Sequence, residues 1–191
     1  IIPCPVIPDR QDLGDIETLA NSIKIGSDVD QPIIVRPSKT EEGRFERVCG
    51  NRRLEAAKLA GLKAVTCKVQ ELSDEEAFRI HGTENIHRKD KNPIEEAQFF
   101  EAWKSTCKAT YEDIAADLGL ETPTYVYDRT KLLGLSPIVK HKIRSAPNFD
   151  LFHAKLLLQV KDPKLQEKLA NDVSEKGLTT RELEKRIREL Q

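Results

Sequence analysis

The stretch Cys49-Gly50-Asn51-Arg52-Arg53-Leu54-Glu55-Ala56-Ala57 decides how the first third of this chain folds. It joins an apolar run to an alanine-rich segment through a glycine, and this pattern predicts a strand, a sharp turn and a helix. Asn51 is a good helix N-cap, which would place Arg52 and Arg53 in the first helical turn. Free backbone N–H groups and two guanidinium groups at a helix start favour phosphate binding. A charged helix start with no ligand gives the same short pattern.

The residues around this stretch predict a small sheet. Two apolar runs, at 32–36 and 44–49, flank the polar segment 38–43, which is typical of a hairpin connection. The other expected elements are a strand over 64–69 and two helices over 15–23 and 51–59, the second ended by Gly61. We therefore predict an α+β unit with a mixed sheet.

Helix start signals dominate from residue 73 onward. Three pairs fit the capping-box pattern, and three further pairs place an N-cap residue before proline. They are Ser73 with Glu76, Thr110 with Asp113, Thr179 with Glu182, Asn92-Pro93, Ser136-Pro137 and Asp162-Pro163. The sequence pattern changes near residue 90 from mixed strand and helix signals to helix signals alone. This change predicts a mixed-sheet N-terminal domain over 1–90 and an all-α domain over 91–191.

A second polar motif, Glu84-Asn85-Ile86-His87-Arg88, ends the helix that we expect to begin near Asp74. An adjacent carboxylate and amide can hold Mg²⁺ through its waters or contact a ribose, and Arg88 can contact phosphate. Alternatively, Arg88 complements the dipole at a helix C-terminus and Asn85 helps the chain to turn. These residues alone leave both interpretations open.

Residues 111–133 have the pattern of a helix-turn-helix. A first helix over 111–118 is followed by Gly119, and Thr122-Pro123 begins a second helix that continues to about Leu133. The second helix of such a motif lies in the DNA major groove. Between Arg129 and Phe149 there are several basic residues and no acid, which predicts a phosphate-facing patch. An ordinary helical hairpin with a solvated basic face is the alternative.

The predicted DNA-binding residues share a basic, hydroxyl or aromatic side chain on or just beyond the second helix. They are Thr124, Tyr125, Tyr127, Arg129, Lys131, Lys140, Lys142, Arg144 and Lys155.

Composition restricts the class of protein. The chain of 191 residues has 31 Lys and Arg against 32 Asp and Glu, which argues against a strongly basic DNA coat protein. Its four cysteines are scattered, which argues against a zinc site or a disulfide framework. Cys49 lies beside arginines that could activate a nucleophile, but its place at the end of an apolar run favours a buried thiol.

Targeting and membrane signals are not apparent in the sequence. No apolar run approaches the roughly 18 residues that span a bilayer, so we expect a cytoplasmic protein without a membrane partner. The chain begins at Ile1 and contains no Met, so we expect it to be part of a longer protein.

Taken together, these segments resemble the ParB family of chromosome and plasmid partition proteins over nearly the whole chain. The similar stretches follow the order of the family: residues 2–8, 19–23, 31–37, 50–61, 84–88 with 92–97, the helix-turn-helix, and 177–185. The resemblance implies a ParB/sulfiredoxin-like N-terminal domain that binds CTP and Mg²⁺. It also implies a homodimer that binds a palindromic double-stranded centromere site and has a ParA-type ATPase as its partner. Such a protein closes around DNA as a clamp, spreads, and is reset by slow CTP hydrolysis.

The resemblance assigns roles to residues of both polar motifs. Gly50, Asn51, Arg52, Arg53 and Arg88 would bind the nucleotide, while Glu84 and Asn85 would hold the metal and serve as catalytic residues in hydrolysis.

Four departures from the family pattern stand out. Ile7-Pro8-Asp9 replaces Gln-Pro-Arg, which puts an acid where an arginine would help to hold phosphate. His87 replaces glutamine, Phe152-His153-Ala154-Lys155 replaces Gly-His-Ala-Arg, and the turn before Tyr125 is one residue longer.

Two other functions compete with partition. A DNA-binding regulator or nucleoid-occlusion relative would use the same clamp without a partition ATPase. A sulfiredoxin-like enzyme would need its cysteine at Asn51, two residues after Cys49, and a serine-kinase-like enzyme would have no use for the helix-turn-helix.

Overall fold

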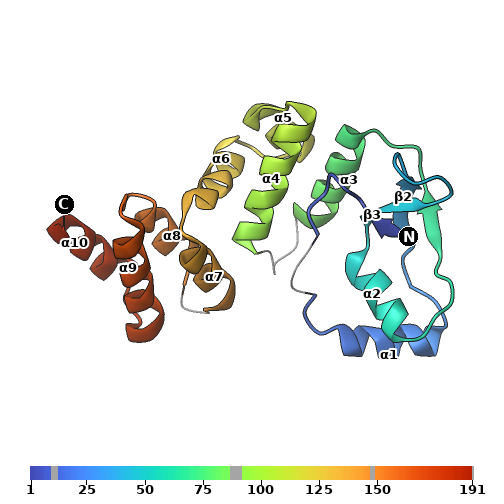
Figure 1. Cartoon of the computed structure of the whole chain (residues 1–191), viewed down its shortest axis with the longest axis horizontal. Helices are drawn as coiled ribbons and strands as arrows, with labels where there is room; N and C mark the ends of the chain where they lie inside the picture. The colour runs from blue at the N-terminus through green and yellow to red at the C-terminus, as the bar shows by residue number, and fades with distance from the viewer. Residues whose placement is uncertain (10–12, 87–91, 147–148, 191) are drawn as a thin grey trace.

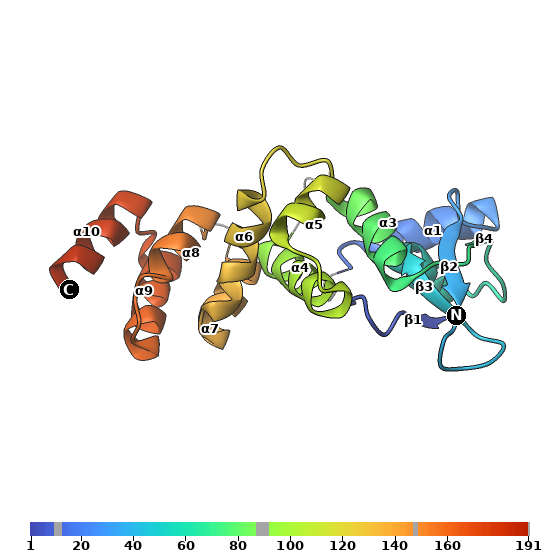
Figure 2. The same cartoon turned by 90° about the horizontal axis from the view of Figure 1, so that it is seen from above.

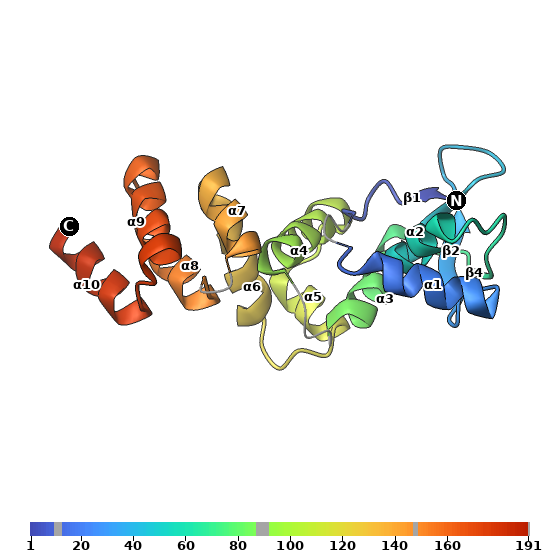
Figure 3. The ribbon, with the colours of Figure 1, turned by 90° about the horizontal axis from the view of Figure 1, so that it is seen from below.

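The structure, a computed structural model, describes residues 1–9, 13–86, 92–146 and 149–190. A small four-stranded sheet with three helices lies at one end, and the remaining helices follow one another along the long axis to α10 at the other end (Figure 1). The views from above and from below show the same succession (Figures 2 and 3). The predicted fold class, a small mixed sheet followed by a helical region, is confirmed.

The sheet is built on a hairpin. Its strands are β1 (Ile2–Pro3), β2 (Ile33–Pro37), β3 (Phe45–Cys49) and β4 (Cys67–Val69), in the order β1-β3-β2-β4. β2 and β3 are antiparallel, whereas β1 pairs with β3, and β4 with β2, in parallel. The predicted hairpin is therefore confirmed. The strand predicted over 64–69 is shorter than expected, and the two-residue strand β1 was not predicted.

Two helices pack on the sheet, and a third packs on one of them. α1 (Ile16–Gly26) packs on α2 (Asn51–Leu59), and Leu54 of α2 packs on Ile33 and Val35 of β2. α3 (Asp74–Ile86) packs Ala77 and Phe78 against the residues at the end of β3. The turn at Gly50 therefore lies where β3 enters α2 and where α3 packs beside it.

The helical region consists of short helices whose starts the sequence marks clearly. They are α4 (Pro93–Cys107), α5 (Tyr111–Asp117), α6 (Thr124–Lys131), the 3₁₀ turn η1 (Leu132–Gly134), α7 (Pro137–Ser145), α8 (Leu151–Leu157), α9 (Pro163–Lys176) and α10 (Thr180–Leu190). All six predicted caps are confirmed by side-chain hydrogen bonds. Two further caps were not predicted: Asp15 caps α1, and Asp150 and His153 form a capping box at α8.

Two hydrophobic clusters meet at α4. Phe100 and Trp103 of α4 belong to a cluster that includes β3, α3, α5 and α6, while Ile94 belongs to a cluster with α7 to α10. Side chains from both sides of residue 90 thus share one core, and the division into domains 1–90 and 91–191 stays a prediction. In the described part of the chain, no helix is long and apolar enough to cross a membrane.

Candidate nucleotide and nucleic-acid sites

The turn between β3 and α2 depends on a glycine. Gly50 has φ +97°, a left-handed conformation that costs other residues free energy, and it forms the N-cap position of α2. A Cβ atom at this position would lie 3.3 Å from Ile33 Cγ1. The prediction that Asn51 caps the helix is wrong, because Asn51 is already the first helical residue and Gly50 provides no side-chain cap.

The two arginines after this turn are held by main-chain carbonyl groups. Arg52 Nη2 donates to the carbonyl oxygen of Asp15 at 3.1 Å, and Arg53 Nη1 donates to those of Gln31 at 2.7 Å and Pro32 at 3.0 Å. The buried Nε of Arg52 has no hydrogen-bond partner among the described residues. Neutral carbonyls orient a guanidinium group without cancelling its charge, so these arginines suit an anionic ligand.

The second polar motif lies beside the first. Arg53 Nη2 is 3.9 Å from Glu84 Oε1, so the two motifs, 31 residues apart in sequence, meet in space. Asn85 Nδ2 donates to the carbonyl oxygen of His81 at 2.8 Å, and His81 Nδ1 is 2.7 Å from the carbonyl oxygen of Val48. The His81 contact joins α3 to the end of β3, whereas the Asn85 hydrogen bond lies within α3. Arg88 lies outside the described residues.

Asp9, which stands where the family pattern has arginine, forms an ion pair with Arg47 of β3. The Arg47 side chain is only 7% exposed, whereas that of Asp9 is 51% exposed. The carboxylate at position 9 therefore neutralises a cation of this chain, and Arg47 is a charged neighbour of the turn that the sequence analysis did not consider.

A buried ion-pair network joins β2, β3 and the start of α3. Arg36 Nε is 2.8 Å from Glu46 Oε2 and its Nη1 is 2.7 Å from Asp74 Oδ1, with Arg36 and Glu46 at most 1% exposed. Burial favours the neutral form of Glu46, but hydrogen bonds from Arg36 and from the Lys39 backbone N–H outweigh it and hold its pKa below the usual value. This pair could have been found from the sequence, because each strand of the predicted hairpin carries one of two opposite charges. In the sheet, Arg36 and Glu46 are direct cross-strand partners.

The predicted DNA-binding residues of α6 point in two directions. Thr124, Tyr127 and Lys131 are exposed, with the Tyr127 side chain 42% exposed. Tyr125 and Arg129 instead contact α4, where Arg129 Nε donates to Glu96 Oε2 at 2.8 Å. One side of α6 is therefore available to a macromolecule and the other is bound to its own scaffold.

The exposed side of α6 continues onto neighbouring helices through an aromatic and lysine cluster. Lys131 Nζ lies 4.8 Å from the centroid of the Tyr127 ring, and Tyr127 packs edge-on against Tyr111 at 5.5 Å. Lys104 Nζ donates to the Tyr111 hydroxyl at 3.2 Å, and this hydrogen bond lowers the pKa of Tyr111. Lys104 and Tyr111 were not predicted from the sequence, because three different helices bring these side chains together.

The basic residues beyond α6 lie on α7 and α8. Lys140 Nζ donates to the carbonyl oxygen of Leu133 at 3.1 Å, and Arg144 Nη2 donates to Gln98 Oε1 at 3.4 Å. Lys142 is partly exposed on the same helix. Lys140 and Arg144 thus contact neutral oxygens, and α7 itself contains three Lys or Arg residues and no acid.

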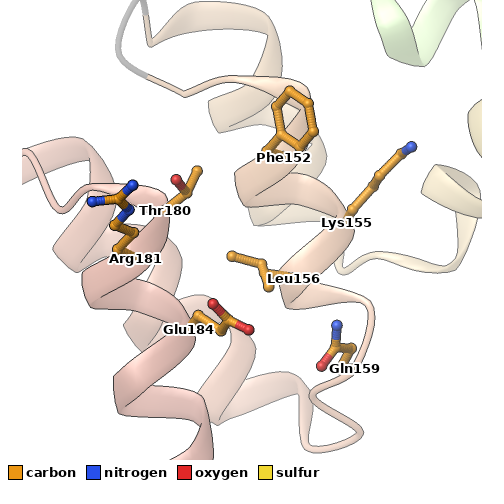
Figure 4. A pocket seen from close by; sticks show the side chains of 7 residues that line it. All are labelled: Phe152, Lys155, Leu156, Gln159, Thr180, Arg181 and Glu184. Atoms are coloured by element: carbon orange, nitrogen blue, oxygen red, sulfur yellow. The ribbon is translucent and has the colours of Figure 1, made fainter.

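Lys155 of α8 forms an ion pair with Asp128 of α6. It lines a pocket of about 280 Å³ between α8 and α10, shown in Figure 4. The pocket is lined by Phe152, Lys155, Leu156, Gln159, Thr180, Arg181 and Glu184. Phe152 at the edge of this pocket is 68% exposed.

Metal and thiol chemistry receive little support from the described residues. In ranges 1–9, 13–86, 92–146 and 149–190, no group of three His, Cys, Asp or Glu side chains could hold a metal ion. Glu84 and Asn85 could still contribute to Mg²⁺ that is held mainly by phosphates, as this ion commonly is. Cys49 is 2% exposed, which weighs against a nucleophilic role.

Two family profiles match the chain, one after the other. The ParB N-terminal domain matches residues 4–86, and the ParB HTH domain matches residues 89–191.

Curated relatives match most of the chain. The probable chromosome-partitioning protein ParB of Coxiella burnetii is 38% identical over 185 residues, which cover 96% of this chain and 61% of that protein. ParB of Caulobacter vibrioides is 36% identical over 170 residues, which cover 89% and 54%. The chain thus spans about three fifths or less of the length of these relatives.

A crystal structure of C-terminally truncated ParB from Caulobacter crescentus, complexed to the centromeric parS site, has a similar fold. It aligns with 98% of this chain and 94% of its own at a TM-score of 0.62 and 34% identity. A complex of that protein with CTP-gamma-S aligns with 90% of this chain at a TM-score of 0.41, too low to support an inference.

Proposed function

From the premise that this chain belongs to the ParB family of partition proteins, we propose that it is the DNA-binding and nucleotide-responsive part of a centromere-binding protein. Its helix-turn-helix, α5 and α6, would bind a specific palindromic site on double-stranded DNA. Its N-terminal unit would bind CTP, which favours a closed clamp that spreads along DNA. This is a two-state protein whose ligand binds one state better than the other.

The observation that carries this proposal is the meeting of the two polar motifs at Arg53 and Glu84. A glycine turn, a helix N-terminus and two arginines held by neutral carbonyls form one surface, and a carboxylate borders it. A site that binds a polyphosphate needs cations beside free backbone N–H groups. This chemistry supports a nucleoside triphosphate as the ligand.

The residues fit CTP in distinct roles. Gly50, Asn51, Arg52 and Arg53 would contact the phosphates, where the unpartnered Nε of Arg52 offers a further donor. Arg88 would add a phosphate contact, while Glu84 and Asn85 would hold Mg²⁺ and orient the water for slow hydrolysis. The triphosphate of CTP would supply the negative charge that attracts these arginines, and Mg²⁺ would bridge its oxygens. Hydrolysis would reset the clamp.

The helical region supplies the DNA-binding surface in this proposal. The exposed side of α6 would contact base edges, and the cations of α7 would contact phosphates on either side. A palindromic site requires two copies of the chain, so a homodimer follows. A ParA-type ATPase would move the assembled complex, which would be associated with the nucleoid or a plasmid.

Binding of labelled CTP tests the proposal, with ATP and GTP as controls, in Mg²⁺, with and without a library of DNA duplexes. We expect CTP-selective binding that increases when DNA is present. DNA binding without nucleotide binding would instead indicate a DNA adaptor in which the Asp9 and His87 departures have removed the switch. Binding of neither ligand would overturn the proposal.

A further inference from the structure

One carboxylate of α4 holds two side chains of α6. The Tyr125 hydroxyl donates to Glu96 Oε1 at 2.8 Å, and Arg129 Nε donates to Glu96 Oε2 at 2.8 Å. The Arg129 guanidinium also lies 4.7 Å from the centroid of the Tyr125 ring. Because Tyr125 and Arg129 are four residues apart, they lie on the same side of α6, and Glu96 contacts both at once.

The contact is largely shielded from water. The Glu96 side chain is 12% exposed and that of Arg129 is 15% exposed. Burial disfavours the charged form of Arg129, but the hydrogen bond and attraction of Glu96 outweigh burial and raise its pKa. A pair in this environment depends on both partners, since removing either one leaves the other charge poorly solvated.

α6 has little intrinsic stability to set its own position. It has only eight residues, its N-cap is Pro123 without a side-chain hydrogen bond, and its first turn contains no acid. Helices this short are marginal in water without good caps. Burial of Val126 and Thr130 fixes how deeply α6 packs, but apolar contacts are not directional. Burial of these residues turns one face of α6 inward, and the two hydrogen bonds to Glu96 add a directional contact to α4 that helps to set the rotation of α6 about its axis.

We propose that Glu96 is a positioning residue for DNA recognition and that Arg129 serves this contact rather than binding DNA phosphate. The inference rests on the proposed function, in which α6 is the recognition helix. When Glu96 fixes α6, the exposed side presents Thr124, Tyr127 and Lys131 to DNA. Arg129, neutralised by Glu96, adds no net charge to that surface.

The experiment begins by selecting a binding duplex from a random library with the unaltered chain. Fluorescence anisotropy then measures the affinity for that duplex and for a scrambled duplex over a series of KCl concentrations. The variants are Glu96→Gln, Arg129→Gln, the double variant, and Lys131→Gln as the control on the exposed side of the same helix. Far-UV circular dichroism confirms that each variant retains its helices.

We expect Glu96→Gln and Arg129→Gln each to lower the ratio of selected to scrambled affinity by about tenfold, because both residues act through one contact. The double variant should be no worse than either single variant, and the salt dependence on scrambled DNA should stay unchanged. Lys131→Gln should instead flatten that salt dependence by about one unit of slope.

Three results would overturn the inference. In the first, Arg129→Gln flattens the salt dependence while Glu96→Gln binds DNA as tightly as the unaltered chain or more tightly. That result would make Arg129 a phosphate contact. The second is an unchanged affinity ratio for Glu96→Gln. The third is additive losses in the double variant. If the unaltered chain selects no duplex at all, the proposed function itself fails, so the two failures are distinguishable.

Discussion

At the start of α2, Arg52 rests on a main-chain carbonyl group, and Arg53 rests on two of them with the Glu84 carboxylate 3.9 Å away. In the helical region, Arg129 and Lys155 instead contact the carboxylates of Glu96 and Asp128 directly, at 2.8 and 2.5 Å. A carbonyl partner orients a cation and leaves its charge available, but a carboxylate partner cancels that charge. The number of basic residues in a segment therefore does not equal the positive charge with which that segment can bind an anion.

Each region also contains the opposite kind of contact. In the sheet unit, Arg36 is buried against Glu46 and Asp74, and Arg47 is paired with Asp9. In the helical region, Lys140 rests on the carbonyl oxygen of Leu133. The partner of each cation, rather than the region, thus separates cations that hold the fold together from cations that can bind a ligand.

The largest expected effect is on nucleotide binding by Arg52→Ala. This change removes a cation whose hydrogen bond is to a neutral carbonyl group, together with an Nε donor that has no partner in the described part of the chain. We expect loss of CTP binding with little change in affinity for the selected DNA duplex, measured by binding of labelled CTP and by anisotropy. Lys58→Ala is the control and should bind CTP normally, because Lys58 is an exposed cation of the same helix that is paired with Glu55.

Equal loss of CTP and DNA binding in Arg52→Ala would contradict the separation of the two sites. It would place the carbonyl-held arginines among the residues that maintain the fold.

The next largest effect is on stability, through Glu46→Gln. Arg36 would lose its main partner while it stays buried, which costs about 3 kcal/mol in the free energy of unfolding. Chemical denaturation measures this loss. Glu41→Gln is the control, because Glu41 pairs with Arg44 at a site where both side chains are more than half exposed, and such pairs contribute little.

The pH dependence of the same variant gives a second test. Because the pKa of Glu46 is lowered in the folded state, its contribution is present above the ordinary pKa of glutamate and is lost as pH falls through the folded value. The stability of Glu46→Gln should therefore fall less steeply with acidification than that of the unaltered chain. Parallel curves would show that Glu46 does not titrate with unfolding.

On α7, the double variant Lys140→Gln/Lys142→Gln should weaken DNA binding about tenfold for selected and scrambled duplexes alike. Two phosphate contacts would be lost, so the slope of log affinity against log salt should fall by about two. Lys155→Gln should change the slope by less, because Asp128 already offsets that charge. An unchanged slope in the double variant would show that the α7 cations face away from DNA.

The sequence predicts those parts of the molecule that depend on neighbouring residues. The caps at Ser73, Thr110 and Thr179 need only a partner three residues away, and all three form. Strand β1 escaped prediction because two residues form a strand only when β3 lies beside them. The proximity of the two polar motifs followed only from the family resemblance, since no local pattern joins Arg53 to Glu84.

The partners of the charged side chains could not be predicted in the same way. Arg129 and Lys131 are both basic residues of α6, and nothing local distinguishes them. Glu96, 33 residues before Arg129, comes beside it only because α4 and α6 pack together. A sequence pattern therefore identifies the cations of a site, while tertiary packing decides which of them keep their charge.

The smallest expected effect comes from Gly50→Ala, which tests whether the carbonyl-held arginines depend on the shape of the turn. An L-residue at φ +97° is strained by about 1 kcal/mol or more, and the new Cβ would lie 3.5 Å from Arg53 Cζ. The closest neighbour of the new Cβ would be Ile33 Cγ1 at 3.3 Å, so the strained turn and Ile33 must adjust. We expect a modest loss of stability together with weaker CTP binding, because the adjusted turn moves the start of α2 that carries both arginines. Gly26→Ala is the matched control, since a Cβ there meets nothing within 4 Å and alanine favours the helix α1 that contains it. If Gly50→Ala loses stability but binds CTP normally, the turn serves only the fold, and the charge that the arginines retain is sufficient without their exact placement.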